Sequence, residues 1–282
     1  MTQTLAHSIE SAMSAAPDSH AIEFAAHWYT WSDLNSAMSK LEALLSQAGL
    51  GAQTPVAILL RNRPGMVAAA LQVIKTDRCV VTINPFQGPD KLAADIRAQR
   101  PAVIVADPQD WSQEPIQEAA REVGRLAIQM KLDEAGAAAE IVSGIQRKKD
   151  GSFQQPMPGV AVLMLSSGTT GPAKRIELPS KQLERSFASA AAYEKKRPNA
   201  GASDASKPQR TPSILSAPMV HIGGLYFMLD AVLAGRPFAL LEKFNVQDYV
   251  RVLNAYRPKA VSLAPTAMRM LLDAKVDPDT FS

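Results

Sequence analysis

The chain reads LMLSSGTTGPAKR from Leu163 to Arg175. Its apolar run stops abruptly, and the next six residues hold four hydroxyl side chains and two glycines. A proline and the cations Lys174 and Arg175 follow closely. Glycines let successive backbone N–H groups converge on an anion, and a lysine adds a mobile positive charge. The stretch therefore predicts a phosphate-holding loop at the end of a buried strand, rather than an ordinary polar turn.

Two familiar loops do not fit this spacing. A Walker A loop ends in Gly-Lys-Ser/Thr, but Ala173 stands in place of the glycine and Arg175 in place of the hydroxyl. A nucleophile elbow needs a glycine two residues before its serine, where Leu165 precedes Ser167. These mismatches exclude a P-loop NTPase and an elbow hydrolase. A Ser-dependent amide hydrolase stays open on composition alone.

Short apolar runs alternate with amphipathic helical patterns on both sides of this loop, as in an α/β fold with mainly parallel sheets. Before the loop we expect strands at 56–60, 80–83, 102–106 and 126–130, with helices at 34–48, 64–74, 89–99 and 112–123. After it we expect strands at 160–165, 174–178, 213–217, 237–241 and 260–264, with helices at 180–195, 223–234, 246–256 and 266–274. The polar stretch 142–156 reads as a connection. We therefore predict two packed α/β subdomains, residues 1–157 and 158–282.

Composition narrows the function classes. The chain has 282 residues, of which 46% are apolar and 20% charged, a profile typical of a soluble globular protein. Its net charge of +3 is too small to predict nucleic-acid binding. No apolar stretch reaches the roughly 18 residues of a membrane span, and the N-terminus lacks a secretory pattern, so we expect a cytoplasmic protein. The single cysteine, Cys79, lies in an apolar run and is expected to be buried in a strand.

The segment from Ser166 to Lys174 resembles the phosphate-loop signature of the adenylate-forming enzymes, which include acyl-CoA synthetases, peptide-synthetase adenylation domains and luciferases. Further segments resemble family motifs in the same order along the chain: Thr30–Leu34, Leu71–Lys75, Val81–Pro85, Pro218–Leu225 and Leu263–Thr266. The likeness covers about residues 20 to 282. It implies the N-terminal portion of an adenylate-forming enzyme fold, without the family's C-terminal domain, and inactive when alone.

The resemblance also implies a reaction. A carboxylic acid would attack ATP to give an acyl-adenylate and pyrophosphate, and a thiol such as coenzyme A would then take the acyl group. Lys174, helped by Arg175, would neutralise the pyrophosphate, and His221 would line the carboxylate site. Mg²⁺ would bridge the phosphate oxygens. The implied phosphate-binding residues are Ser166, Ser167, Gly168, Thr169, Thr170, Gly171 and Lys174.

Three positions depart from the family pattern. Ala173 stands where the family usually has proline, and Arg175 and Asp77 stand where it usually has glycine. No metal-ligand spacing joins the histidines, so no protein metal site is predicted. The sequence does not identify the acid, and a homodimer stays open as the assembly. A non-catalytic phosphate- or acyl-binding protein stays open as an alternative function.

Overall fold

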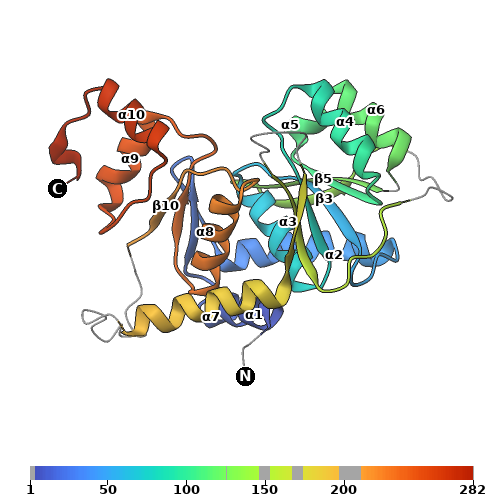
Figure 1. The fold of residues 1–282 in the computed structure, drawn as a ribbon, viewed down its shortest axis with the longest axis horizontal. Helices are drawn as coiled ribbons and strands as arrows, with labels where there is room; N and C mark the ends of the chain where they lie inside the picture. The colour runs from blue at the N-terminus through green and yellow to red at the C-terminus, as the bar shows by residue number, and fades with distance from the viewer. Residues whose placement is uncertain (1–3, 125, 146–152, 167–173, 197–210, 282) are drawn as a thin grey trace.

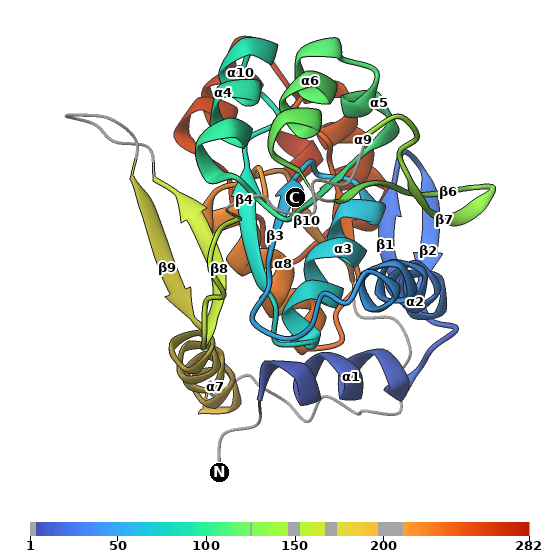
Figure 2. The ribbon, with the colours of Figure 1, turned by 90° about the vertical axis from the view of Figure 1, so that its right-hand side faces the viewer.

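The computed structural model describes residues 4–124, 126–145, 153–166, 174–196 and 211–281. Their strands form a seven-stranded and a four-stranded sheet, with helices packed on both (Figures 1 and 2). The expected α/β fold is confirmed. None of the helices in these ranges combines the length and apolar character that a membrane crossing requires.

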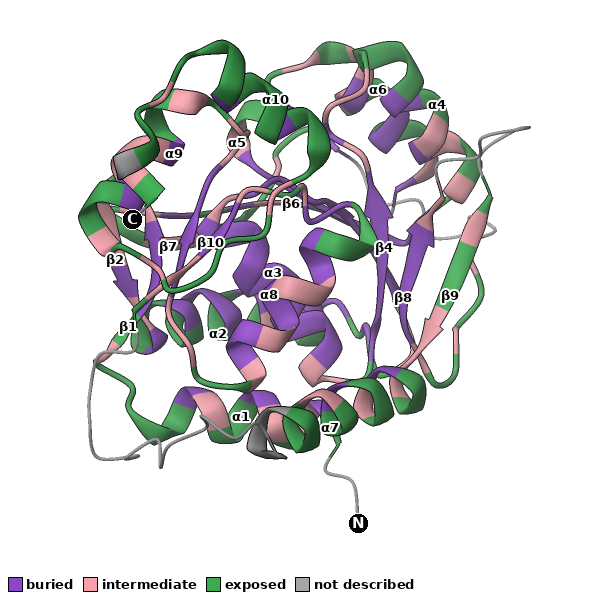
Figure 3. Ribbon diagram, turned by 60° about the vertical axis from the view of Figure 1, so that its left-hand side comes forward, coloured by how far each residue is buried: buried purple, intermediate pink, exposed green. Residues whose placement is uncertain are grey.

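The larger sheet runs in the order β7-β6-β5-β3-β4-β8-β9. Its five inner strands are parallel, and the edge strands β7 and β9 are antiparallel to their neighbours. Its strands are β3 (Pro55–Leu59), β4 (Cys79–Ile83), β5 (Val103–Ala106), β6 (Leu126–Asp133), β7 (Gly136–Ile141), β8 (Val160–Leu165) and β9 (Arg175–Pro179). The strands β3 and β4 are buried throughout, as expected for parallel strands covered on both faces (Figure 3).

Successive residues of these strands face two separate cores, because side chains alternate across a sheet. Val56 and Ile58 join the core under α2 (Trp31–Gln47) and α3 (Pro64–Lys75). Ala57 and Leu59 face the other core, formed with α4 (Pro89–Gln99), α5 (Pro108–Trp111) and α6 (Glu114–Val123). Cys79 is buried in β4 as expected, and burial raises the pKa of its thiol to about 12.

The smaller sheet has the order β10-β11-β1-β2, in which only β2 is antiparallel to its neighbour. Its strands are β1 (His20–Phe24), β2 (His27–Thr30), β10 (Ser213–Leu215) and β11 (Phe238–Leu240). The remaining helices are α1 (Leu5–Ala15), α7 (Ser180–Lys196), α8 (Ile222–Leu233), α9 (Val246–Tyr256), α10 (Pro265–Asp273) and the 3₁₀ helix η1 (Pro278–Phe281). Helices α8 and α9 contribute to different cores. Leu215 of β10 lies in the core with α8, and Ile214 lies in the core with α9.

One expectation needs correction. The strand expected at 260–264 is absent: these residues are mostly exposed, and no strand of the described chain pairs with them. The expected division after residue 157 stays a prediction, and the two sheets each take strands from both sides of that residue. Strands β8 and β9 complete the larger sheet from beyond residue 157, while β1 and β2 join the smaller sheet from before it. The chain therefore crosses between the two sheets more than once.

Candidate functional site

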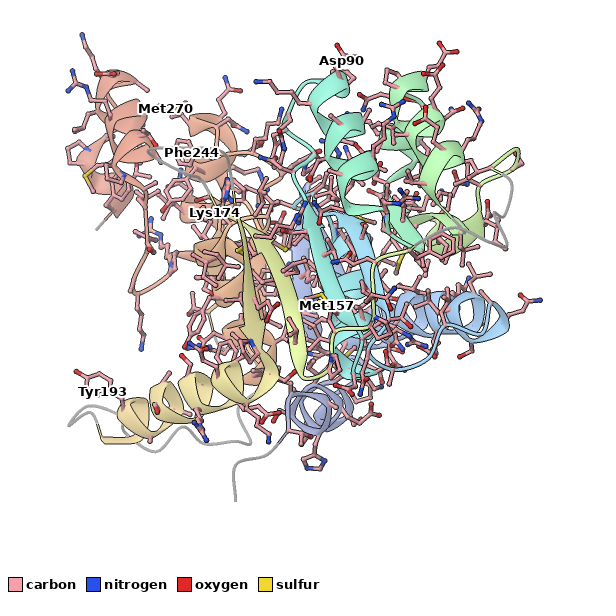
Figure 4. All side chains as sticks on the ribbon, turned by 45° about the vertical axis from the view of Figure 1, so that its right-hand side comes forward. Asp90, Met157, Lys174, Tyr193, Phe244 and Met270 are labelled. Carbon is pink, nitrogen blue, oxygen red and sulfur yellow. The ribbon has the colours of Figure 1, made fainter. Side chains whose placement is uncertain are left out.

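The two ends of the Ser/Thr/Gly loop are fastened to each other. The backbone N–H and the Oγ of Ser166 both donate to the carbonyl oxygen of Lys174, at 2.7 and 2.8 Å. The N–H of Lys174 donates back to Ser166 Oγ at 3.2 Å. These bonds close the hairpin of β8 and β9 between Ser166 and Lys174, and Lys174 is exposed directly before β9 (Figure 4).

The centre of the loop carries most of the expected phosphate contacts. These residues are Ser167, Gly168, Thr169, Thr170 and Gly171, and they lie outside the described residues. What the structure does define is the frame that presents them. The loop leaves the carboxyl end of a strand inside a parallel set, which is the usual place for ligands in such sheets.

Arg175 has a different position from the one expected. Its guanidinium donates to both carboxylate oxygens of Asp95 at 2.7 Å and to the carbonyl of Thr82 at 2.7 Å. The side chains of Arg175 and Asp95 are only 11% and 13% exposed. The guanidinium therefore fastens β9 to α4 and β4, and this position argues against the expected help to Lys174.

A further departure from the family pattern, Asp77, is explained by the backbone conformation. Asp77 has a φ of 55°, in the left-handed region that favours glycine. Its carbonyl oxygen accepts the N–H of Gln53 in the turn between α3 and β4. The glycine usual at this position thus suits the backbone, and Asp77 adopts the same conformation with a side chain.

His221 stands directly before α8, on the turn that follows β10. Its N–H donates to the carbonyl of Pro218 at 3.0 Å, and its own carbonyl accepts the N–H of Leu225. A Cβ at Gly224 would collide with the Pro218 carbonyl, so glycine is required there for the turn to pack against the helix. The His221 side chain is exposed at the carboxyl end of β10. Its closeness to the loop and to a cavity stays a prediction.

Asn62 connects these regions and was missed at the sequence level. It follows β3 and is fully buried. Its Nδ2 donates to the carbonyls of Ala217 and Leu241, both at 3.0 Å, and its Oδ1 accepts the N–H of Met219 at 2.8 Å. One side chain therefore joins the segments that follow β3, β10 and β11, and so links the carboxyl ends of strands from the two sheets.

Arg61 and Arg63 flank Asn62 and are held by carboxylates. Arg61 pairs with the buried Asp110 at 2.6 Å. Burial raises the pKa of the Asp110 carboxyl, although the Arg61 guanidinium opposes that shift. Arg63 pairs with Asp107 at 2.8 Å and Glu242 at 3.0 Å, and these two carboxylates raise its pKa against the effect of burial. A run of three polar side chains directly after a buried strand was the signal in the sequence.

The chain matches the model of the AMP-binding enzyme family over residues 9–281. A relative in Arabidopsis thaliana, 4-coumarate–CoA ligase-like 3, is 23% identical over 266 residues, which cover 88% of this chain and 44% of that protein. The 2-succinylbenzoate–CoA ligase of Staphylococcus epidermidis is 29% identical over 42% of this chain and 23% of its own length. The chain spans less than half the length of the coumarate ligase relatives it matches.

Solved structures show the same fold. The O-succinylbenzoate coenzyme A synthetase of Bacillus subtilis, in complex with ATP and magnesium ion, aligns with a TM-score of 0.70 at 18% identity, over 98% of this chain and 67% of that one. A putative long-chain-fatty-acid CoA ligase from Rhodopseudomonas palustris aligns with a TM-score of 0.74 at 16% identity, over 100% and 68%. With the match of the family model along nearly its whole length, the chain belongs to the AMP-binding enzyme family.

Proposed function

We propose that this chain supplies the phosphate and carboxylate sites of an ATP-dependent, AMP-forming acid–thiol ligase. The observation that carries the proposal is the closure of the Ser/Thr/Gly loop by Ser166 and Lys174 at the carboxyl end of β8, in a chain of the AMP-binding family. Ser166 and Lys174 fasten the two ends of the loop to each other, and Lys174 is exposed beside it. Such a frame suits a phosphate chain better than a buried structural turn.

In the first half-reaction a carboxylate oxygen attacks the α-phosphorus of ATP, and pyrophosphate leaves with the electrons of the broken P–O bond. The hydroxyls and amides of residues 167–171 would hold the β- and γ-phosphates. Lys174 would neutralise the charge that grows on the departing pyrophosphate. This is catalysis by positioning and charge, which needs no covalent step on the protein.

Ser166 has a narrower role than a phosphate ligand. Its hydroxyl hydrogen already serves the Lys174 carbonyl, so we assign it to keeping the loop closed. The same bond argues against an amide hydrolase with Ser166 as nucleophile, because a backbone carbonyl cannot take the proton from the hydroxyl.

His221 would border the carboxylate, on the turn that Asn62 holds against β3. Strand β3 is separated from β8 by β4 alone, so the two strands run about 10 Å apart. Because Asn62 ties the histidine turn to the end of β3 and the loop follows β8, we expect one activated acid to reach both. This spacing supports the assignment of both sites to one reaction.

Mg²⁺ would neutralise the phosphates when bound. The described residues offer no cluster of three carboxylate, thiolate or imidazole ligands, so phosphate oxygens and water would be its main partners here. In the second half-reaction a thiol, coenzyme A by analogy with the relatives, would attack the acyl carbonyl of the adenylate and release AMP.

ATP–pyrophosphate exchange with the full-length protein tests the proposal. The acids to compare are 4-coumarate, 2-succinylbenzoate and a long-chain fatty acid, since relatives and structural neighbours are named for these. We expect exchange that depends on one class of acid and on Mg²⁺. ATP binding without exchange for any acid would favour a non-catalytic nucleotide-binding protein. Covalent labelling of a loop serine by a serine-directed reagent, with amide turnover, would overturn the proposal.

A further inference from the structure

The turn that carries His221 takes part of its hydrogen bonding from Asn62. Between the end of β10 and the start of α8, the N–H of Met219 has the side chain of Asn62 as its acceptor. The carbonyl of Ala217 in the same turn accepts a hydrogen bond from the Nδ2 of Asn62. Asn62 thus binds the turn through one donor and one acceptor, which fixes its orientation as well as its position.

The same amide also holds the chain after β11. Its second N–H donates to Leu241, and the neighbouring Arg63 pairs with Glu242 directly afterwards. Both amide N–H groups and the carbonyl oxygen of Asn62 therefore bond backbone that follows strands of the smaller sheet, although Asn62 itself follows β3 of the larger sheet. A buried amide used in this way leaves little freedom for the two sheet edges to shift against each other.

We propose that Asn62 is a positioning residue that sets the place of His221 relative to the loop between Ser166 and Lys174. The inference rests on the proposed function, because it assumes that one activated acid contacts both places. Asn62 acts through the Pro218–His221 turn and does not itself touch the acid. Its role is geometric. Asn62 holds the turn next to the end of β3, and Ser166, where the loop begins, follows the end of β8 in the same sheet.

The first test measures the clamp itself, without ligand or turnover. Asn62→Asp keeps the side-chain shape but replaces the amide NH2, which supplies both donors, by one oxygen that faces the carbonyls of Ala217 and Leu241. Asn62→Ala removes the amide altogether. In both variants we expect hydrogen–deuterium exchange at the Met219 amide to rise about tenfold or more, the equivalent of about 1.4 kcal/mol. Peptides from β5 and β6 should keep their wild-type exchange.

Ile104→Val is the matched control, since Ile104 is buried in β5 in the core on the α4–α6 face, away from the turn. It should lower stability slightly and leave residues 216–225 protected. Unchanged exchange at 216–225 in both Asn62 variants would overturn the clamp. An equal rise in every peptide would also overturn it, because Asn62 would then stabilise the whole domain and place no particular turn.

The second test follows His221 directly. Its ring Hε1 resonance, assigned by its loss in His221→Gln, should shift or broaden in Asn62→Asp and stay in place in Ile104→Val. An unmoved resonance beside a loosened Met219 amide would show that the turn can relax without displacing the histidine, and would refute the positioning role.

The third test separates this inference from the proposed function. In pyrophosphate exchange by the full-length protein, Asn62→Asp should raise the KM for the acid about tenfold, while the KM for ATP changes less than about twofold. Equal changes in both constants would contradict the inference. Absence of exchange by the wild type with every acid would refute the proposed function, and the two ligand-free tests would still decide the role of Asn62.

Discussion

The hydroxyl of Ser166 bonds both main-chain groups of Lys174, as donor to its carbonyl and acceptor from its N–H. This exchange closes the loop at its base and leaves the lysine side chain free to reach a ligand. The two residues therefore have different roles: Ser166 fixes the ends of the loop, and Lys174 supplies a positive charge. Predictions about the loop should distinguish these two roles.

Lys174→Ala in the full-length protein should weaken the adenylation step. Loss of one charge-assisted contact to the departing pyrophosphate is worth about 1.5–3 kcal/mol, or roughly a tenfold to hundredfold fall in exchange rate. Lys181→Ala is the control, because Lys181 is exposed on α7 and outside the proposed site. Exchange that ignores Lys174→Ala would remove the lysine from the mechanism.

Arg175→Ala should unfold more easily and still bind ATP. The change leaves Asp95 without its bidentate partner in a site that is 13% exposed, and removing one partner of a buried pair costs about 3–5 kcal/mol. We expect the lower part of that range, measured by urea unfolding. Asp95→Asn should shift stability in the same direction. A loss of ATP affinity as large as that of Lys174→Ala, at unchanged stability, would return Arg175 to the phosphate site.

The sequence was sufficient for the alternating α/β fold because apolar periodicity alone separates buried strands from amphipathic helices. It also located the loop, because closely spaced hydroxyls, glycines and cations are suited to binding a phosphate. It could not assign β1 and β2 to the smaller sheet, because β1 pairs with β11, about 200 residues later in the chain, and β2 joins the sheet only through β1. The strand expected at 260–264 failed for a related reason: an apolar run becomes a strand only beside a partner.

The site shows the same limit at the level of single residues. Arg175 reads as a second phosphate cation because it follows Lys174 in sequence, yet strand alternation turns it toward Asp95. Asn62 belongs to no motif and is marked only by its place in a polar run after a buried strand, because its three partners come from two distant loops. The chemical character of the loop could thus be predicted from neighbouring residues in the sequence, whereas contacts between the two sheets could not.

Asp77→Gly should stabilise the protein by about 0.5 kcal/mol. The φ of Asp77 is 55°, and glycine, which has no Cβ, would adopt this turn without the steric crowding that a Cβ causes. Asp77→Val should instead cost about 1–2 kcal/mol, because a branched side chain resists the left-handed region. Chemical denaturation of the three proteins measures both effects. A Val variant as stable as the wild type would show that the turn can refold into an extended form.

The Glu42–Arg78 pair should make stability fall in acid. Burial alone would raise the pKa of Glu42, but hydrogen bonds from Arg78, Ser46 and Gln72 outweigh it and lower the pKa below the ordinary value of 4.5. A carboxyl whose pKa is lower in the folded state contributes stability above its unfolded pKa and loses it as pH falls through the folded pKa. Arg78 is only 4% exposed and would then be left facing a neutral acid.

Unfolding free energies measured from about pH 7 down to about pH 3 test this linkage. Glu42→Gln should be less stable than the wild type at neutral pH, by about 1 kcal/mol, since the carboxylate is about a third exposed and water screens part of the pair. The difference should shrink as the pH falls, because the wild-type carboxyl then becomes neutral as well. Glu118→Gln is the control on the exposed face of α6 and should run parallel to the wild type. A Glu42→Gln curve that stays parallel to the wild type down to the lowest pH would show that Arg78 gains nothing from the charge of Glu42.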